Sequence, residues 1–207
     1  MIRYNSIQKV FFLTKIFLIC IFLNTSVFSE NKVANNGYAV LGEEMAPIKI
    51  KVFSSFTCPH CADFHLNVVP KIKKKYIDTG KVQLIFIDFP LDQVAFNASK
   101  VLHCLGQNKQ MLFLDNIYEN QSTWASGSSV DDINKKLKKI AMNYDINSNK
   151  FDKCLIDESI SDKILSGRIE AQTKYSIEST PTVVINEKKL DGSANFKNIE
   201  KNIEKII

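Results

Sequence analysis

Two cysteines separated by two residues, Cys58 and Cys61, are the side chains in this chain with the clearest capacity for chemistry. The tetrapeptide Cys58-Pro59-His60-Cys61 follows a strand-like run, Ile48 to Phe56, and precedes a helix-like one. Two thiols at this spacing can form a redox-active disulfide or supply half of a zinc site. A strand before the pair and a helix after it favour the redox function, because the N-terminus of a helix activates a thiol.

A proline directly before a β-branched strand is the second feature that bears on this chemistry. Residues 179–185 read Ser-Thr-Pro-Thr-Val-Val-Ile, so Thr180 and Pro181 lead into a strand near the C-terminus. The cysteine pair and this Thr-Pro pair together resemble the active site of a thioredoxin-type thiol-disulfide enzyme.

The alternatives for the cysteine pair are a structural disulfide and a metal site. A haem attachment motif needs histidine directly after the second cysteine, where this chain has Ala62. A zinc site needs two further ligands, and the sequence contains no second Cys-x-x-Cys motif. We interpret His65 and His103 as ordinary helix residues. We therefore expect no metal and no cofactor.

The first residues of the chain have the composition of an export signal. Three basic residues accompany an apolar run from Val10 to Leu23, and residues with small side chains precede Glu30. The apolar run is shorter than the roughly 18 residues that a bilayer-spanning helix needs. We predict a cleaved signal peptide over residues 1–29 and a periplasmic location, and an uncleaved membrane anchor is the alternative.

The charge of the chain does not indicate a nucleic-acid partner. The whole sequence carries a net charge of +5, and without residues 1–29, which hold three basic and no acidic residues, the net charge is +2. Lysine clusters at 73–75, 135–136 and 138–139 lie on helix-like segments and are typical of a solvated helix face. Residues 30–207 suit one domain, and their four cysteines suit a compartment that permits disulfides.

The pattern of apolar residues predicts an α/β domain. A strand over 48–53 leads to the cysteines, a helix follows from Phe64 to Tyr76, and an apolar strand runs from Val82 to Phe89. Later helices are expected over 93–105, 109–119, 130–144, 147–156, 162–175 and 196–206, with a hairpin over 182–190. Residues 30–47 are polar and indicate a short arm. This order predicts a thioredoxin-like fold with an α-helical insertion, approximately residues 91–160, after the second core strand.

Nearly the whole chain after residue 29 resembles the DsbA family of bacterial disulfide oxidoreductases, within the thioredoxin superfamily. The resemblance is carried by the segment Phe53 to Cys61, by the helical insertion and by Thr180-Pro181. Pro-His between the cysteines is the usual dipeptide of this family, whereas thioredoxins more often have Gly-Pro. One difference is Val52, which stands where enteric members have a buried acidic residue.

The resemblance implies a peptide-binding loop and protein partners. Pro181 would be a cis-proline that faces the cysteines, with Thr180 just before it, and the backbone there would bind an extended substrate peptide. The substrates would be exported proteins with free thiols. A DsbB-type membrane oxidase linked to quinone would return the enzyme to its oxidised form.

The predicted position of Cys58 at a helix N-terminus would stabilise its thiolate, because unpaired backbone N–H groups and the helix dipole favour negative charge there. His60 would add hydrogen bonding or positive charge, and Pro59 fits the first turn because it lacks an N–H. Cys61 is expected to be the more buried partner, which resolves stalled mixed disulfides. A stabilised Cys58 thiolate makes the disulfide of this pair a reactive oxidant.

Two further cysteines, Cys104 and Cys154, lie near the two ends of the predicted insertion. We predict that they form a structural disulfide, and a pair of buried free thiols is the alternative. Some DsbA-like proteins carry such an extra bridge. We interpret Trp124, with Phe113 and Tyr118, as an aromatic cluster of the core.

These features favour a monomeric periplasmic oxidase that introduces disulfides into exported proteins. A disulfide isomerase or reductase of the same fold is the closest alternative, and Thr180 occurs in both kinds. The known isomerases of this fold have an N-terminal dimerisation module, for which residues 30–47 are too few. A non-catalytic thioredoxin-like binding module and a glutathione-linked transferase are further alternatives, and the retention of both Cys58 and Cys61 argues against them.

Overall fold

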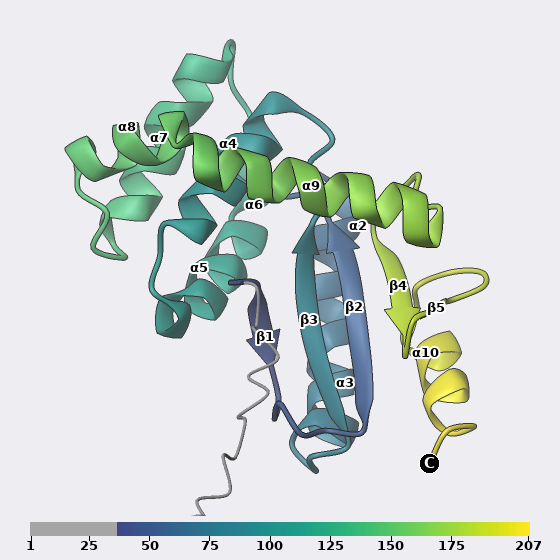
Figure 1. Cartoon of the computed structure of the whole chain (residues 1–207). Coiled ribbons are helices and arrows are strands. Elements are labelled where there is room, and N and C mark those ends of the chain that lie inside the picture. The colour runs from purple at the N-terminus through teal and green to yellow at the C-terminus, as the bar shows by residue number, and fades with distance from the viewer. Residues whose placement is uncertain (1–36) are drawn as a thin grey trace, which may run out of the picture. The chain divides into compact units, whose positions relative to one another are not determined.

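The computed structural model describes residues 37–207, so the predicted signal peptide lies outside the described residues. The centre of the domain is a five-stranded sheet with the strand order β1-β3-β2-β4-β5 (Figure 1). The strands are β1 (Ala39–Leu41), β2 (Ile48–Ser54), β3 (Val82–Asp88), β4 (Thr182–Ile185) and β5 (Lys188–Lys189). The β2–β3 pair is parallel, and the other three pairs are antiparallel.

The two central strands, β2 and β3, set the position of the cysteines. In β2, the side chains of Ile48, Ile50 and Val52 are fully buried and alternate with less buried ones, which is the period of a strand. The β2–β3 register places Ser54 opposite Asp88. Because parallel strands end at the same edge of a sheet, the loops that follow β2 and β3 meet there.

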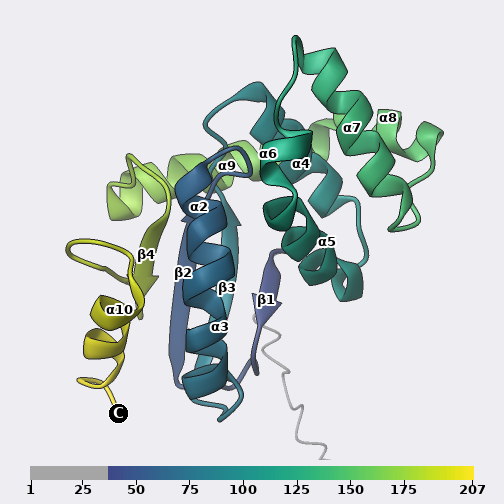
Figure 2. The same cartoon turned by 180° about the vertical axis from the view of Figure 1, so that it is seen from behind.

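One helical segment, from Pro59 to Ile77, connects β2 to β3 and covers one face of the sheet (Figure 2). It consists of α2 (Pro59–Asp63), a π-helical turn (Phe64–Val68), α3 (Val69–Ile72) and a second π-helical turn (Lys73–Ile77). The first π-helical turn directly precedes α3, whose second residue is Pro70. Proline lacks an N–H and crowds the preceding turn, and a wider turn accommodates it.

Six helices lie between β3 and β4: α4 (Gln93–His103), α5 (Gln107–Glu119), α6 (Gln121–Trp124), α7 (Val130–Met142), α8 (Ser148–Ile156) and α9 (Glu158–Tyr175). The long α9 covers the sheet face opposite to α2 and α3 (Figures 1 and 2). Its residues Ala171 and Tyr175 pack with Phe53, Phe89 and Val184 in a hydrophobic cluster on that face. The C-terminal α10 (Phe196–Ile203) packs against α3.

The predicted order of strands and helices is confirmed from Ile48 onward, including the helical insertion. The reading of 30–47 as an arm was wrong for Ala39–Leu41, which form β1 and pair with β3. The helix α6 was also missed. Segments of three or four residues are too short to show a strand or helix period, so pairing and packing with the rest of the domain determine them.

The insertion is closed by a disulfide between Cys104, at the end of α4, and Cys154 in α8. The two Cα atoms are 6.1 Å apart. Within the same insertion, Phe113, Tyr118 and Trp124 are buried in the main hydrophobic cluster. In the part of the chain that the structure describes, no helix combines the length and the apolar character needed to cross a bilayer.

Candidate active site

Cys58 is the residue that begins the helix after β2. Its backbone is extended (φ −79°, ψ 118°), and Pro59 is the first helical residue. The N–H of Cys58 donates to the carbonyl of Ser55 at 3.1 Å. The carbonyl of Cys58 accepts from the N–H groups of Cys61 and Ala62 at 3.0 and 3.2 Å. Cys58 is thus the N-cap of α2, where first-turn N–H groups lack helical partners and favour negative charge.

The loop before β4 lies directly against Cys58. The Thr180-Pro181 peptide bond in this loop is cis. The Cys58 thiol donates to the Thr180 carbonyl oxygen at 3.4 Å, although 122 positions separate the two residues. Because β4 pairs with β2, with Phe53 opposite Thr182, the residues just before β4 lie beside those just after β2. The structure therefore brings Cys58 and the Thr180-Pro181 pair together.

Cys61 follows Cys58 by one helical turn and is more deeply buried, with an exposed fraction of 1% against 8%. The N–H of Ser55 donates to its sulfur at 3.5 Å. Burial raises the pKa of the Cys61 thiol to about 12, and the hydrogen bond from the Ser55 N–H offsets part of this increase. At neutral pH the Cys61 thiol therefore keeps its proton. The two cysteines are chemically unequal, because only Cys58 is placed at the helix N-terminus.

Pro59 and His60, the two residues between the cysteines, are exposed on the first turn of α2. They border the surface that a protein approaching Cys58 would contact. Pro59 takes the first helical position, where its missing N–H costs no hydrogen bond. The predicted effect of Pro59 and His60 on the Cys58 thiolate stays a prediction.

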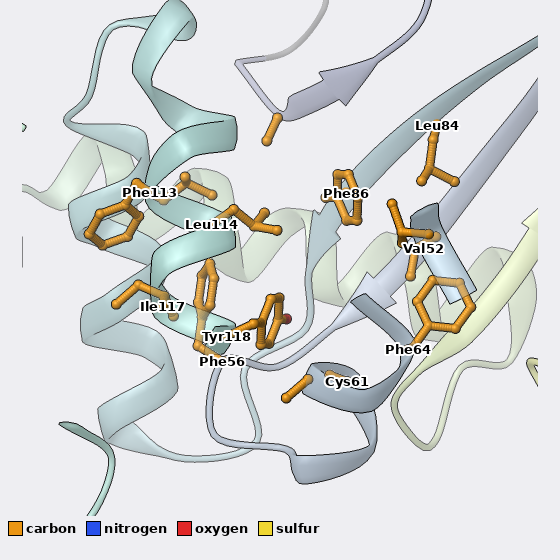
Figure 3. Packing of buried hydrophobic residues seen from close by; sticks show 14 of the residues in the cluster. Val52, Phe56, Cys61, Phe64, Leu84, Phe86, Phe113, Leu114, Ile117 and Tyr118 are labelled. Atoms are coloured by element: carbon orange, nitrogen blue, oxygen red, sulfur yellow. The ribbon is translucent and has the colours of Figure 1, made fainter. Parts of the chain in front are cut away.

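Buried aromatic side chains pack beside Cys61. Phe56 and Tyr118 pack with ring centroids 5.5 Å apart, and Figure 3 shows both beside Cys61. Burial raises the pKa of Tyr118 well above its ordinary value, and the neighbouring Cys61 and Asp88 act in the same direction. Val52 is fully buried in the same cluster. An apolar environment of low dielectric constant disfavours a thiolate at Cys61.

Gln121, the first residue of α6, holds the loop between β2 and α2. Its Nε2 donates to the carbonyl of Phe56 at 2.8 Å and to the carbonyl of Cys58 at 3.0 Å. Sequence reasoning missed this residue. A glutamine in a polar stretch has no pattern that marks it as buried, so the sequence offers no signal for it.

A second set of hydrogen bonds holds the same loop from the side of β3. The Thr57 hydroxyl donates to Asp92 at 2.6 Å, and the N–H of Leu91 donates to the Ser55 hydroxyl at 3.3 Å. The other carboxylate oxygen of Asp92 accepts from the N–H of Ala95 and caps α4. The carboxylate of Asp92 therefore links the start of the helical insertion to the loop that carries Cys58.

Known proteins are similar to this chain in sequence. The family model described as Thioredoxin matches residues 34–205. The probable disulfide bond formation protein D of Bacillus anthracis is 31% identical over 174 residues, which cover 80% of this chain and 76% of that protein. The chain belongs to the DsbA family of thiol-disulfide oxidoreductases.

Solved structures of DsbA-family proteins agree with the fold. Alpha-DsbA1 of Wolbachia pipientis is 33% identical, with a TM-score of 0.73 over 81% of this chain and 89% of that chain. BdbD of Bacillus subtilis, at 24% identity and a TM-score of 0.71, supports the fold alone. The predicted family, fold class and enzyme class are confirmed, and this DsbA-family protein is a thiol-disulfide oxidoreductase.

A hollow of about 230 Å³ adjoins the active site of this DsbA-family enzyme. It is lined by residues between Ser176 and Ala194, among them Pro181, Val183 and Leu190. The hollow thus begins at the loop that contacts Cys58 and continues along β4. Among residues 37–207, no three cysteine, histidine or acidic side chains gather closely enough to hold a metal ion.

His65 and His103 lie on helical segments, as interpreted, and the structure adds that each ring is buried against a carboxylate. The His65 ring is 5% exposed and its Nε2 lies 2.7 Å from Asp115. The His103 ring is 2% exposed and its Nε2 lies 2.7 Å from Asp88. Both histidines are therefore buried partners of a carboxylate, since a buried imidazole needs a hydrogen bond.

Proposed function

We propose that this enzyme is a periplasmic protein-disulfide oxidase that donates a Cys58–Cys61 disulfide to exported proteins. One observation carries the proposal: Cys58 is the N-cap of α2, and its sulfur lies 3.4 Å from the Thr180 carbonyl. A thiolate stabilised at a helix N-terminus is a good leaving group. The disulfide that contains Cys58 would therefore pass readily to a substrate dithiol.

The reaction has two exchange steps. In the first, a substrate thiolate attacks the sulfur of Cys58, the Cys58–Cys61 bond breaks, and Cys61 takes up a proton because its pKa is raised to about 12. In the second, the other substrate thiol loses its proton and attacks the substrate sulfur of the mixed disulfide, and Cys58 leaves as a thiolate. Two electrons pass from the substrate dithiol to the enzyme, and the substrate departs oxidised.

The Thr180-Pro181 loop would hold the substrate during both steps. The backbone there lies beside Cys58, and a hollow of about 230 Å³ continues from it along β4. An extended peptide can add backbone hydrogen bonds at such a loop and place a side chain in the hollow. Pro59 and His60 would border the bound peptide and support the Cys58 thiolate.

Turnover requires an acceptor for the two electrons. A DsbB-type membrane oxidase linked to quinone would reoxidise Cys58 and Cys61, and the enzyme would act as a monomer in the periplasm. Family membership and the signal-like composition of residues 1–29 support this placement.

Equilibration of the purified protein with glutathione buffers tests the direction of transfer. We expect the Cys58–Cys61 pair to be much more oxidising than a thioredoxin, whose potential is about −270 mV. A potential near that of thioredoxin would favour the reductase alternative and overturn the proposal. Removal of Cys104 and Cys154 by alanine substitution in a parallel sample ensures that the second disulfide does not contribute to the signal.

Trapping of the mixed disulfide tests the roles of the two cysteines. The Cys61→Ala variant, mixed with a reduced protein that contains a single accessible thiol, should accumulate a mixed disulfide through Cys58 after mild oxidation, because neither partner then has a second thiol to resolve it. The matched Cys58→Ala variant should accumulate much less, because the remaining thiol is buried and protonated. Equal trapping by the two variants, or full oxidase activity in Cys58→Ala, would contradict the assignment.

A further inference from the structure

The side chain of Gln121 joins the helical insertion to the backbone of the cysteine loop. Its amide nitrogen donates to two carbonyl groups of the loop, those of Phe56 and Cys58, at 2.8 and 3.0 Å. The residue is buried, with an exposed fraction of 9%. Because both bonds are buried, water cannot readily replace them if the amide is lost.

Buried side chains and a buried hydrogen bond anchor the segment that carries Gln121. Tyr118 and Trp124, on either side of it in the sequence, are 3% and 1% exposed. The indole N–H of Trp124 donates to the carbonyl of Ile117 at 2.8 Å, so α6 is tied to the end of α5. Gln121 therefore extends toward the loop from a segment that is packed into the core on both sides.

We propose that Gln121 is a positioning residue for Cys58, and that it makes the Cys58 thiolate more stable. The proposal rests on the proposed role of Cys58 as the reactive cysteine. One forked amide group sets the distance and orientation of two carbonyls in the loop. One of them belongs to Cys58 itself and also accepts from the N–H groups of Cys61 and Ala62. The bond to Gln121 thus fixes the peptide group from which the Cys58 side chain extends.

The partial charges of the Gln121 amide also favour the Cys58 thiolate. A carbonyl oxygen carries partial negative charge, and two of them, on Phe56 and Cys58, are close in sequence to the reactive sulfur. The positive end of the Gln121 amide faces both oxygens. Without it, both carbonyl groups would lose a donor near a developing thiolate in a site of low dielectric, which disfavours the charged form, and the Cys58 carbonyl would keep only the N–H groups of Cys61 and Ala62.

Gln110 provides a matched control within the same insertion. It is 3% exposed, and its Nε2 donates to the carbonyls of Gly37 at 3.1 Å and Leu102 at 3.5 Å. Gln110 and Gln121 therefore share residue type, burial and a forked amide that bonds two backbone carbonyls. They differ in which carbonyls they hold, since only Gln121 contacts the loop of Cys58.

The test compares Gln121→Met, which keeps the side-chain length but removes the donors, with Gln110→Met and with the unchanged protein. The proteins are expressed from the full-length sequence. The pH midpoint of thiolate formation at Cys58 is measured by the rate of alkylation, and the disulfide equilibrium is measured with glutathione. We expect Gln121→Met to raise the midpoint by about half a pH unit or more, and to shift the equilibrium about threefold toward the disulfide. Gln110→Met should lose stability in urea but leave both readouts unchanged.

An unchanged midpoint and an unchanged glutathione equilibrium in Gln121→Met would overturn the proposal and leave Gln121 a structural residue. Equal shifts in Gln110→Met would overturn it as well, because the effect would then follow general destabilisation. If Gln121→Met does not fold, Gln121→Leu, which also removes the donors and adds no charge, serves for the same measurements. Failure of the oxidase function is a separate result, since it would show as a thioredoxin-like equilibrium in the unchanged protein.

Discussion

His103 and Asp88 share a hydrogen bond of 2.7 Å, and their side chains are only 2% and 5% exposed. His103 is the last residue of α4 and Asp88 the last residue of β3, so the bond joins the helical insertion to the central sheet. Loss of one partner would leave the other buried without a hydrogen bond or access to water. The pair therefore holds the insertion in one arrangement over the sheet.

Asp88→Ala should lower the free energy of unfolding by about 3–5 kcal/mol, the cost of breaking a buried pair. The matched variant is Asp115→Ala. Its carboxylate also pairs with a buried histidine, His65, but is 50% exposed, so we expect a smaller loss of about 1–3 kcal/mol, the cost of leaving the buried ring without this hydrogen bond. Urea unfolding followed by circular dichroism measures both values. Losses of equal size in the two variants would show that burial of the carboxylate does not matter.

Replacement of Cys104 and Cys154 by alanine should destabilise the domain by about 4 kcal/mol in the chain-entropy model, because the bridge closes a loop with a separation of 50 residues. The loss is measured by urea unfolding without reductant. The reactivity of Cys58 should remain, and alkylation of the reduced double variant serves as the control. A double variant as stable as the unchanged protein would contradict the structural role of the bridge.

The stability of the protein should depend on Glu187 at acid pH. Burial acts to raise the pKa of Glu187, but hydrogen bonds from Lys174, Lys51 and Tyr175 outweigh it and lower the pKa to about 2. The stabilisation is therefore complete above the pKa of an unfolded glutamate, about 4.3, and is lost as the pH falls toward 2. Because the side chain is 51% exposed, salt should weaken the effect.

Urea unfolding of Glu187→Gln at several pH values checks this dependence. The variant should be less stable than the unchanged protein at neutral pH, and the difference should shrink between pH of about 4.3 and 2. The exposed Glu178, changed to glutamine, is the control and should show a much smaller difference. A stability difference for Glu187→Gln that stays constant across this range would refute the ion-pair explanation.

A brief alkylation of the reduced protein near neutral pH should modify Cys58 and spare Cys61. Cys61 is 1% exposed, and burial raises its pKa to about 12, so very little thiolate is present. Mass spectrometry of the digested protein reads the label at each position. The denatured protein should take up label at both cysteines. Equal labelling of both in the folded protein would contradict the asymmetry between them.

Much of the fold was accessible from local patterns. The alternation in β2 and the apolar run of β3 predicted the two parallel strands, because a strand repeats every two residues and its pattern is visible in the sequence. The sequence patterns did not predict the short β1 and α6, because the stability of these elements comes from pairing and packing. The burial of His65 and His103 was not predicted either, because a buried imidazole and an exposed one look alike in sequence until the partner carboxylate is known.

By itself, the sequence determined which two thiols are candidates for a redox pair and what precedes and follows them, since Cys58, Cys61, β2 and α2 are contiguous in the chain. Only the tertiary structure decided what surrounds them. The Thr180 carbonyl reaches Cys58 because β4 pairs with β2, and Gln121 reaches the same residue because α6 packs under the loop. Hydrogen bonds between residues so far apart in the chain depend on how the helices and strands pack. The local sequence around each residue does not reveal that packing.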